Sequence, residues 1–505
     1  MSEKADFLAI DLGAESGRAL LGSFDGEKVG LREVHRFPNA PVRVSGSLHW
    51  DVLGIWREIK GGLAKAARES GRLESVGVDS WGVDFGLLDR DGVLVSNPYH
   101  YRDSRTDGMV ERATERVPEA EIYRTTGIQF MPINTLYQLL AMEDSPQLEV
   151  ADTLLMVPDL IGYWLTGEKA CEFTNATTTQ LYDANAGDWA WDLMRRLGIP
   201  EHLFPGIVAP GTRLGSVLAE VAEETGVEEG LPVTEIASHD TASAVVAVPA
   251  EGEDFAYISS GTWSLVGVEL VGSSVAQDGM RVNFTHEGGF GGTTRFLKNV
   301  MGLWILQECR RTWAREGQDL SYEELTSLAE SVPAGVCLVD PDHPAFLPPG
   351  DMPERIRSFC RDTGQSPPQE PGEYARCVLE SLALKYRWVL ERAEEITGRR
   401  AEVVHIVGGG VQNTLLCQLT ADATRRPVRA GPVEATAVGN LMVQAYARGY
   451  LGSLGEIRDC VRRSFVEVRD YEPEGSGDEW EDAYGRLRGI MDAAAQPDRE
   501  GAGNA

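Results

Sequence analysis

The carboxylate of Asp240 stands at a junction in the chain, between a short polar turn and an apolar, alanine-rich run that ends at Ala247. Such a run is typical of a buried helix, which places Asp240 at or near a helix N-terminus. Capping that helix is the commonest role for an aspartate in this position. Three other segments favour a chemical role as well, because each is a turn rich in glycine or hydroxyl residues that follows an apolar strand.

Two of these turns are similar, and one occurs in each half of the chain. Residues 13–18 have the sequence Gly-Ala-Glu-Ser-Gly-Arg, and residues 259–262 have the sequence Ser-Ser-Gly-Thr. Small residues let backbone N–H groups approach phosphate oxygens, and hydroxyl groups add further donors. Tight hairpins favour the same residues, so either turn alone is a weak signal. Together they predict a phosphate-containing ligand held between two domains.

The third segment comprises residues 406–413, in which a strand runs into three consecutive glycines and then into a helix. Three glycines allow a ring or a phosphate group to approach the backbone closely, whereas a plain strand–helix turn needs only one. Asp11 stands just before the first turn, at the end of an apolar strand. A carboxylate there can hold a magnesium ion beside phosphate groups, or it can simply cap the turn.

The elements that position these residues alternate between strands and helices. We expect a helix at 52–70 and strands at 7–13, 19–24, 29–37, 76–79, 255–258 and 263–268. This alternation predicts an α/β architecture. Because a strand–turn–strand unit begins each half, two related domains joined at the polar stretch 249–254 are the simplest arrangement. The C-terminal end predicts one helix followed by a disordered tail at 496–505.

The composition excludes several function classes. The 505-residue chain has a net charge of −31 and no basic run, so we expect no nucleic-acid partner. It lacks the motifs of P-loop nucleotidases, dinucleotide-binding domains, zinc proteases and serine hydrolases. Its seven cysteines form no Cys-x-x-Cys pair. No apolar run approaches the roughly 20 residues that span a bilayer, and no signal-peptide pattern is present. We therefore expect a soluble, cytoplasmic protein with no membrane partner.

Taken together, these segments resemble the FGGY family of carbohydrate kinases. Residues 13–18 resemble the first phosphate motif of the family, residues 259–264 its second phosphate motif, and residues 406–413 its adenosine motif. Further matching runs are spread along most of the chain. They occur at residues 79–85, 101–105, 134–139, 174–181, 238–244, 297–304 and 431–435.

The resemblance implies an α/β fold of two actin/hexokinase-like (ribonuclease H-like) domains with a ligand cleft between them. The implied domains are 1–248 and 249–475, followed by a C-terminal helix and tail at 476–505. The implied activity is ATP-dependent phosphorylation of a ketose on its terminal hydroxyl group. L-rhamnulose is the first expectation, and L-fuculose or xylulose are alternatives; a non-catalytic actin-like ATP-binding or sugar-sensing protein is a more distant one. The resemblance also implies Mg²⁺ as cofactor, and we expect a monomer or a homodimer.

The resemblance assigns roles to individual residues. Asp240 is the implied catalytic base that takes a proton from the sugar hydroxyl group, and Asp11 is implied to position the magnesium ion. The residues implied to bind ATP are Ala14, Glu15, Ser16, Gly17, Arg18, Thr262, Gln307 and Gly409. Those implied to bind the sugar are Gly82, His239, Asp240, Thr241 and Asn299, and those expected to shape the sugar site are Trp81, Asp84, Arg102 and Arg105.

Glu15 departs from the family pattern, because it stands in the first phosphate turn where a small residue is usual. We expect its side chain to point to solvent or to pair with Arg18, since a carboxylate aimed at phosphate groups would repel them. We expect Asp240 to stay ionised, because a helix N-terminus favours negative charge. The resemblance also includes a cysteine pair, Cys360 and Cys377, that can form a disulfide, although two free thiols suit a reducing cytosol equally well.

Overall fold

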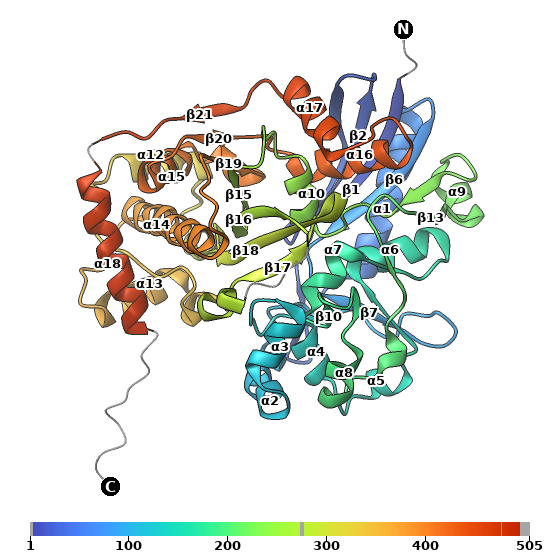
Figure 1. The fold of residues 1–505 in the computed structure, drawn as a ribbon, viewed down its shortest axis with the longest axis horizontal. Helices are drawn as coiled ribbons and strands as arrows, with labels where there is room; N and C mark the ends of the chain where they lie inside the picture. The colour runs from blue at the N-terminus through green and yellow to red at the C-terminus, as the bar shows by residue number, and fades with distance from the viewer. Residues whose placement is uncertain (1–3, 273–276, 476, 495–505) are drawn as a thin grey trace. The chain divides into compact units, whose positions relative to one another are not determined.

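The computed structural model describes residues 4–272, 277–475 and 477–494, and the chain forms two compact units (Figure 1). The first unit comprises residues up to 251 together with 269–297 and 434–466, and the second comprises 252–268, 298–433 and the residues from 467 onward. Each unit therefore draws on separate stretches of the chain. The division predicted at residue 248 stays a prediction, and the predicted disordered tail at 496–505 lies outside the described residues.

A six-stranded mixed sheet forms the centre of the first unit, with its strands in the order β13-β14-β6-β1-β2-β3. β1 (Ala5–Leu12), β2 (Ser16–Phe24) and β3 (Val29–Pro38) form an antiparallel meander. β6 (Leu73–Ser80) lies parallel to β1 on its other side. The register pairs Asp11 of β1 with both Arg18 of β2 and Asp79 of β6. Three charged residues therefore lie side by side at one end of the sheet.

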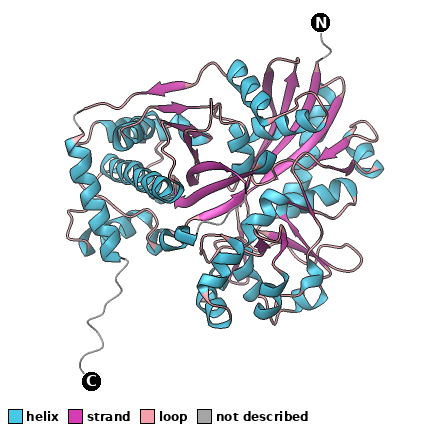
Figure 2. Cartoon of the chain, viewed as in Figure 1, coloured by secondary structure: helices cyan, strands magenta, loops and turns pink. Residues whose placement is uncertain are grey.

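Helices cover both faces of this sheet, as the cyan and magenta elements of Figure 2 show. Gly62 of α1 (Val52–Glu69) packs against Ala19 of β2, and a Cβ atom added to Gly62 would lie 2.8 Å from that of Ala19. Gly22, further along β2, packs instead against Leu441 of α16 (Ala435–Ala447). Because side chains alternate along a strand, α1 and α16 lie on opposite faces of the sheet.

α10 (Asp240–Val246) packs against α16 so closely that one position of α16 requires glycine. A Cβ atom on Gly439 would lie 1.8 Å from the backbone carbonyl oxygen of Ser243 in α10. The hydroxyl group of Ser243 donates to the carbonyl oxygen of Ala237 at 2.7 Å, in the segment that leads into the helix. The contact between the helices therefore holds the start of α10, and with it Asp240, against the helix that covers the sheet.

A separate hydrophobic core lies in the same unit, within residues 85–207. β7 (Phe85–Leu88) pairs with the antiparallel strand β8 (Thr153–Met156), and α2 (Met109–Arg116), α4 (Thr135–Leu140) and α8 (Trp191–Leu197) contribute to the core. The side chains of Tyr137 and Met194 have no exposed surface. This core supports the loop between β6 and β7, which carries Gly82.

The second unit includes the strands β16-β15-β19-β20-β21, which are neighbours in that order in a seven-stranded sheet. β15 (Phe255–Ser260) pairs antiparallel with β16 (Trp263–Val271) and parallel with β19 (Val403–Val407). β1 has the same kinds of partner in the first unit, so the two units repeat one pattern, as the two strand–turn–strand segments predicted. The longest helix, α14 (Pro371–Thr397), packs against α15 (Thr414–Thr424).

The two hairpin turns are shorter than the sequence predicted. Ser16, Gly17 and Arg18 belong to β2, which leaves residues 13–15 as the first turn. Ser259 and Ser260 belong to β15, which leaves residues 261–262 as the second turn. The predicted extents are wrong because polar side chains do not stop strand pairing. The backbone hydrogen-bond ladder of each hairpin continues until only a short turn remains.

The other elements complete both units, and no helix of the described chain is long and apolar enough to cross a membrane. In the first unit they include β4 (Val42–Val44), β5 (Ser47–His49), α3 (Glu119–Thr126), α5 (Pro146–Val150), α6 (Val157–Thr166), β9 (Cys171–Glu172), α7 (Phe173–Ala176), β10 (Tyr182–Asp183), β11 (Asp188–Trp189), β12 (Ile207–Val208), β13 (Arg213–Ser216), α9 (Ala219–Thr225), β14 (Pro232–Thr234), β17 (Thr285–Gly288) and α17 (Leu454–Ser464). In the second they include α11 (Trp304–Arg315), α12 (Tyr322–Glu330), α13 (Met352–Asp362), β20 (Val428–Ala430), β21 (Arg469–Tyr471) and α18 (Asp478–Ala494), and β18 spans Thr293–Met301.

The substitution Gly439→Ala is expected to destabilise the protein, because its Cβ atom would overlap the Ser243 carbonyl group and force two packed helices apart. Overpacking of this kind costs about 1–3 kcal/mol or more. Gly489→Ala is the matched control, because Gly489 lies in the helix α18, is exposed and has no atom within 4 Å of an added Cβ. We expect the control to be neutral or stabilising by up to about 1 kcal/mol. Denaturant unfolding of both variants provides the comparison, and a Gly439→Ala protein as stable as the control would contradict the packing argument.

Candidate functional site

The first turn lies between β1 and β2 and is closed by hydrogen bonds at its base. The N–H group of Gly13 donates to the carbonyl oxygen of Ser16 at 3.0 Å. Asn39 bridges the turn, since its side-chain amide donates to the carbonyl oxygen of Gly13 at 2.8 Å and its backbone N–H donates to that of Glu15 at 2.9 Å. The sequence analysis missed Asn39, because it stands far from the turn in the chain. These bonds leave a rigid loop of small residues at the sheet end.

Arg18 neutralises two carboxylates beside this turn. One nitrogen of its guanidinium group lies 2.5 Å from Asp11 Oδ2, and another pairs with Glu434. Burial of these three groups lets the charges act on one another strongly, because little water screens them. Glu434 was not predicted as a site residue, and Arg18 was predicted to bind ATP, with Glu15 as a possible acidic partner rather than Asp11 and Glu434. The turn is therefore less negative than its acidic neighbours suggest.

Asp79 lies beside Asp11 and is another residue that the sequence analysis did not select. Its side chain is fully buried, and its Oδ2 atom accepts a hydrogen bond from the Asn440 amide at 2.6 Å. Its Oδ1 atom has no hydrogen-bond partner in the described part of the chain. Burial, followed by repulsion from Asp11, raises the pKa of Asp79 well above its usual range. An aspartate at the end of an apolar strand was the signal available in the sequence, as it was for Asp11.

Asp240 is the first residue of α10, and His239 is its N-cap. The Oδ1 atom of Asp240 accepts hydrogen bonds from the backbone N–H of Thr241 at 2.5 Å and from its hydroxyl group at 3.2 Å. The side chain keeps 32% of its surface exposed, yet desolvation by the surrounding protein is the largest influence on its pKa and raises it. The charge of His239 acts in the opposite direction. Burial therefore outweighs the helix-end effect that the sequence predicted.

The three carboxylates of Asp11, Asp79 and Asp240 repel one another. Asp11 raises the pKa of both of the other side chains, and Asp240 contributes to the shift of Asp79. Mutual repulsion between carboxylates favours a bound cation, and divalent metal ions prefer carboxylate oxygens. The unpartnered Oδ1 atom of Asp79 provides an oxygen that no protein donor occupies. The described residues contain no group of three or more His, Cys, Asp or Glu side chains arranged to hold a metal ion, so oxygens from phosphate groups or water would have to supply most of the coordination of an ion here.

A buried ion pair orients His239. Arg295 has no exposed surface, and its Nη2 atom lies 3.0 Å from Glu287 Oε2 and 3.2 Å from His239 Nδ1. A guanidinium group can donate hydrogen bonds but cannot accept them. A hydrogen bond from Arg295 therefore needs Nδ1 of His239 as its acceptor, and the other ring nitrogen, Nε2, lies 3.5 Å from Asp240 Oδ1. Glu287 also lies 3.3 Å from Nδ1, but its charge is already paired with Arg295.

Gly82 lies in a strained loop after β6. A Cβ atom at this position would lie 2.9 Å from the hydroxyl oxygen of Thr178. The next residue, Val83, has a φ of +68°, which is rare for a β-branched residue. Its carbonyl group accepts a hydrogen bond from the Thr135 hydroxyl group at 2.7 Å. Strain of this kind, about 1–3 kcal/mol for one residue, tends to be retained at functional sites.

The residues expected to shape the sugar site differ in their surroundings. Both carboxylate oxygens of Asp84 are engaged, because Oδ2 accepts from the indole groups of Trp50 and Trp81 at 2.6 and 3.0 Å and Oδ1 accepts from Gln138 at 2.8 Å. Burial raises the pKa of Asp84 to about 6. Arg105 donates to the carbonyl oxygen and the side chain of Gln138. Asp84 therefore fixes Trp81 and Gln138 by hydrogen bonds, and Arg105 fixes Gln138 in the same way. The Arg102 guanidinium group lies over the Tyr101 ring.

In the second unit, Thr262 and Gln307 lie near each other. The carbonyl oxygens of Gly261 and Thr262 accept hydrogen bonds from the backbone of Leu303 and Trp304, at the start of α11. Gln307 follows within the first turn of that helix, and its buried Oε1 atom has no partner among the described residues. Asn299 lies half-buried on β18. The hairpin turn, Asn299 and Gln307 were predicted as ligand contacts.

The three glycines after β19 serve two purposes. A Cβ atom on Gly410 would lie 2.0 Å from Ser260 Oγ, and one on Gly408 would lie 3.0 Å from the Ser260 carbonyl oxygen. Gly408 also has a φ of +86°. These two glycines are therefore required by packing against β15. Gly409 alone faces open space, with no atom within 4 Å of an added Cβ, and it is the one predicted to contact ATP.

The cysteines are unpaired in the structure. Cys360 and Cys377 are free thiols, as are the other five cysteines, all of which lie within the described residues. Of the two states that the sequence left open, the structure contains the reduced one.

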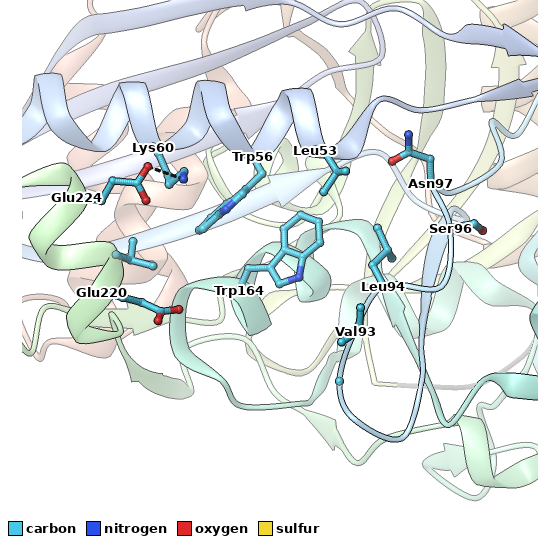
Figure 3. A pocket seen from close by; sticks show the side chains of 12 residues that line it. Leu53, Trp56, Lys60, Val93, Leu94, Ser96, Asn97, Trp164, Glu220 and Glu224 are labelled. Carbon is cyan, nitrogen blue, oxygen red and sulfur yellow. Dashed lines mark hydrogen bonds and ion pairs between the residues drawn. The ribbon is translucent and has the colours of Figure 1, made fainter.

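A groove of about 840 Å³ lies elsewhere on the first unit, between α1, α6, α9 and the loop before Tyr99 (Figure 3). The rings of Trp56 and Trp164 are 5.6 Å apart in it, and Lys60 forms an ion pair with Glu224 at 2.6 Å. None of the predicted site residues lines this groove. It is therefore separate from the carboxylate cluster around Asp240.

Family models and curated relatives match nearly the whole chain. The model of the N-terminal domain of the FGGY family of carbohydrate kinases matches residues 7–247, and that of the C-terminal domain matches residues 256–448. A rhamnulokinase from Bacteroides thetaiotaomicron is 43% identical over 95% of this chain and 98% of its own length. Rhamnulokinases from Enterococcus faecalis and Pectobacterium atrosepticum are 41% and 42% identical, over 92% and 94% of this chain and 93% and 94% of their own length.

Solved structures of similar fold include two from Lactobacillus acidophilus. The crystal structures of a gluconate kinase and of a ligand-bound xylulose kinase match with a TM-score of 0.78 each. The matches cover 98% and 97% of this chain and 99% and 98% of those chains, at identities of 16% and 17%. At such identities the likeness shows the fold alone. The expected two-domain α/β fold is confirmed.

Asp79→Asn is expected to stabilise the ligand-free protein at neutral pH. Burial raises the pKa of Asp79 in the folded state, so folding penalises its charge. That penalty is absent below the unfolded pKa of about 3.9, where the group is protonated in both states, and it grows as the pH rises through the folded pKa. Thermal unfolding measured from about pH 4 to pH 8 provides the test.

The advantage of Asp79→Asn over the wild type is expected at the neutral end of this range and should vanish toward the acidic end. Asp192→Asn is the control, because the side chain of Asp192 is 84% exposed and its substitution should have little effect at any pH. An Asp79→Asn protein that is less stable than the wild type at neutral pH would show that the ionised form is stabilised rather than penalised.

Proposed function

The chain belongs to the FGGY family of carbohydrate kinases, and from this premise we propose that it transfers the γ-phosphoryl group of ATP to the terminal hydroxyl group of L-rhamnulose. The product would be L-rhamnulose 1-phosphate, in the breakdown of L-rhamnose. One observation carries the choice of substrate: rhamnulokinases match this chain at 41–43% identity over nearly its full length. L-fuculose or xylulose remain the alternative substrates within the same chemistry.

The proposed base is Asp240. Phosphoryl transfer needs positioning and charge neutralisation more than covalent help from the protein. A carboxylate near the attacking hydroxyl group can accept its proton as the oxygen bonds to phosphorus. Burial raises the pKa of Asp240, which makes it a better proton acceptor than an exposed aspartate. The neighbouring residues His239 and Thr241 are proposed to bind the sugar, together with Gly82 and Asn299.

Asp11 and Asp79 are proposed to hold Mg²⁺ beside the phosphate groups. When bound, the ion would neutralise charge on the phosphate oxygens as the phosphoryl group is transferred. Arg18 limits repulsion between ATP and the acidic groups around the turn, because it pairs with Asp11 and Glu434. This local compensation matters in a protein whose net charge is −31. The backbone of residues 14–18 is proposed to contact the phosphate groups.

The nucleotide contacts proposed for the second unit are Thr262, Gln307 and Gly409. Gly409 is supported by the open space beside its Cα atom, where a flat group can approach the backbone. Gln307 is supported by its unpartnered Oε1 atom, which can accept a hydrogen bond from a ligand. A sugar-sensing or actin-like protein without catalysis would not need a raised-pKa carboxylate beside a metal-binding pair, so the kinase activity is favoured.

A substrate panel tests the choice of sugar. We expect purified protein with Mg-ATP to release ADP rapidly with L-rhamnulose, and slowly or not at all with L-fuculose, L-xylulose and D-xylulose. Coupled detection of ADP gives kcat and KM for each sugar. Faster turnover on another ketose would contradict the substrate while keeping the mechanism, whereas ATP binding without turnover on any ketose would contradict the kinase function.

Asp240→Asn tests the proposed base. The variant keeps the size of the side chain but cannot accept the proton, so kcat is expected to fall by about 10²–10⁴-fold, equal to roughly 3–5 kcal/mol in activation free energy. ATP binding should persist, and it can be followed as a ligand-induced rise in Tm. Asp192→Asn, on the exposed surface of α8, is the matched control and should keep wild-type turnover. Near-normal kcat in Asp240→Asn would exclude the assigned role.

A further inference from the structure

The carboxylate of Glu172 makes an unusual number of hydrogen bonds for a single oxygen atom. Glu172 ends β9, caps α7 and has no exposed surface. Its Oε2 atom accepts five bonds from three residues. The donors are Thr174 N at 3.0 Å, Thr174 Oγ1 at 2.6 Å, Asn175 N at 3.3 Å, Ser238 N at 3.0 Å and Ser238 Oγ at 2.9 Å.

Two of these five bonds come from a part of the chain far from Glu172. Ser238 stands 66 residues further on and only two residues before Asp240. The backbone N–H of His239 joins the same cluster, because it donates to Thr174 Oγ1 at 3.2 Å, and that hydroxyl group donates to Glu172. The carbonyl oxygen of Ser238 accepts from the backbone N–H of Ser80 at 2.9 Å. The segment before Asp240 is thus held between Glu172 and the end of β6.

The same cluster reaches the strained loop that carries Gly82. Thr178 lies four residues after Thr174, and its hydroxyl oxygen accepts from the backbone N–H of Val83 at 3.3 Å. Thr178 also closes the space beside Gly82. Glu172 therefore supports a short stretch of chain that contacts both groups of predicted sugar-binding residues.

The helix cap alone does not account for Glu172. Bonds from Thr174 and Asn175 would satisfy the start of α7, and a serine, threonine or asparagine could accept those without placing a charge in the interior. Burial penalises the carboxylate and raises the pKa of Glu172, whereas the four hydrogen bonds from Thr174 and Ser238 oppose that shift. A buried carboxylate is retained at such a cost only where its bonds are needed. A longer, charged acceptor is needed only for the two hydrogen bonds that Ser238 donates.

We propose that Glu172 is a positioning residue for phosphoryl transfer, which holds Ser238 and His239 and thereby sets where the Asp240 carboxylate meets the sugar hydroxyl group. This inference rests on the proposed function, in which Asp240 is the base. Glu172 itself touches neither substrate nor ATP in this proposal. Since reacting groups must be placed to within a fraction of an ångström, a loosened Ser238–Asp240 segment lowers the rate of transfer more than the affinity for either substrate.

Glu172→Gln and Ser238→Ala test the proposal through kinetics. Glutamine keeps the size of the side chain but offers a neutral oxygen, which is a weaker acceptor for five donors. We expect Glu172→Gln to lower kcat by about 10- to 100-fold, with the KM for ATP unchanged. Ser238→Ala removes one donor and should have a smaller effect of the same kind. In the double variant the losses should be less than additive, because both substitutions break the same contact.

Glu235→Gln is the matched control. Glu235 is a second buried carboxylate, close enough to repel Glu172, but in the part of the chain that the structure describes its side chain forms no hydrogen bond with Ser238, His239 or Asp240. Its Oε1 atom has no partner among the described residues. We expect Glu235→Gln to keep wild-type kcat, so a loss confined to Glu172→Gln is specific to the contact with Ser238. Equal losses in both variants would overturn the proposal and indicate a general effect of the buried charges.

Hydrogen exchange separates this inference from the proposed function, because it needs no substrate. We expect the amides of Ser238 and His239 to exchange faster in Glu172→Gln than in the wild type and in Glu235→Gln. Wild-type exchange at these amides in folded Glu172→Gln would overturn the positioning role, and so would wild-type kcat. If the wild type phosphorylates no ketose, but the amides of Ser238 and His239 still exchange faster in Glu172→Gln, the proposed substrate is contradicted. The contact between Glu172 and Ser238 would still be supported.

Discussion

Compensation of buried carboxylates is the constraint on which the first unit depends. An ionised carboxylate is strongly destabilised in the interior unless donors or cations surround it. Arg18 provides the compensation for Asp11, five hydrogen-bond donors provide it for Glu172, and Asn440 provides part of it for Asp79. Each of these partners comes from a different part of the chain. The contacts of the acidic groups therefore join segments that are distant in the chain, among them β6 with α16 and β9 with the segment before α10.

Incomplete compensation is found at Asp79, which is assigned to chemistry, and also at the buried carboxylates Asp159 and Glu235, which have no assigned role. Asp79 keeps one oxygen atom without a hydrogen-bond partner among the described residues, and Asp240 accepts hydrogen bonds from Thr241 and lies beside His239. Glu172, which has the fullest set of donors, lies behind them and supports the segment that carries Asp240. At Asp79 and Asp240 a bound cation or a proton could relieve the remaining electrostatic cost. The close contact of Gly439 with α10 also fixes the position of Asp240 relative to the sheet, because α10 and α16 pack without free space between them.

Much of the local structure follows from short stretches of sequence. The apolar runs before residues 13 and 259 form β1 and β15, and the helix expected at 52–70 is α1. The hairpin turns were predicted too long, because serine and arginine at positions 16 and 18 looked like turn residues yet continue the strand ladder. The three glycines after β19 were assigned jointly to a ligand, whereas two of them are needed where the turn meets Ser260. Such packing reasons depend on a partner that is far away in the chain.

The sequence by itself determined the alternation of strands and helices, the turns beside Asp11 and Thr262, and the place of Asp240 at the start of a helix, because each depends on neighbours within a few residues. Its motifs also sufficed for the family. Only the tertiary structure decided that Asp79 lies beside Asp11, that Arg18 pairs with Glu434, and that Glu172 and Arg295 hold the residues before Asp240. Desolvation and charge pairing act through space between residues up to 416 positions apart, so no local pattern records them.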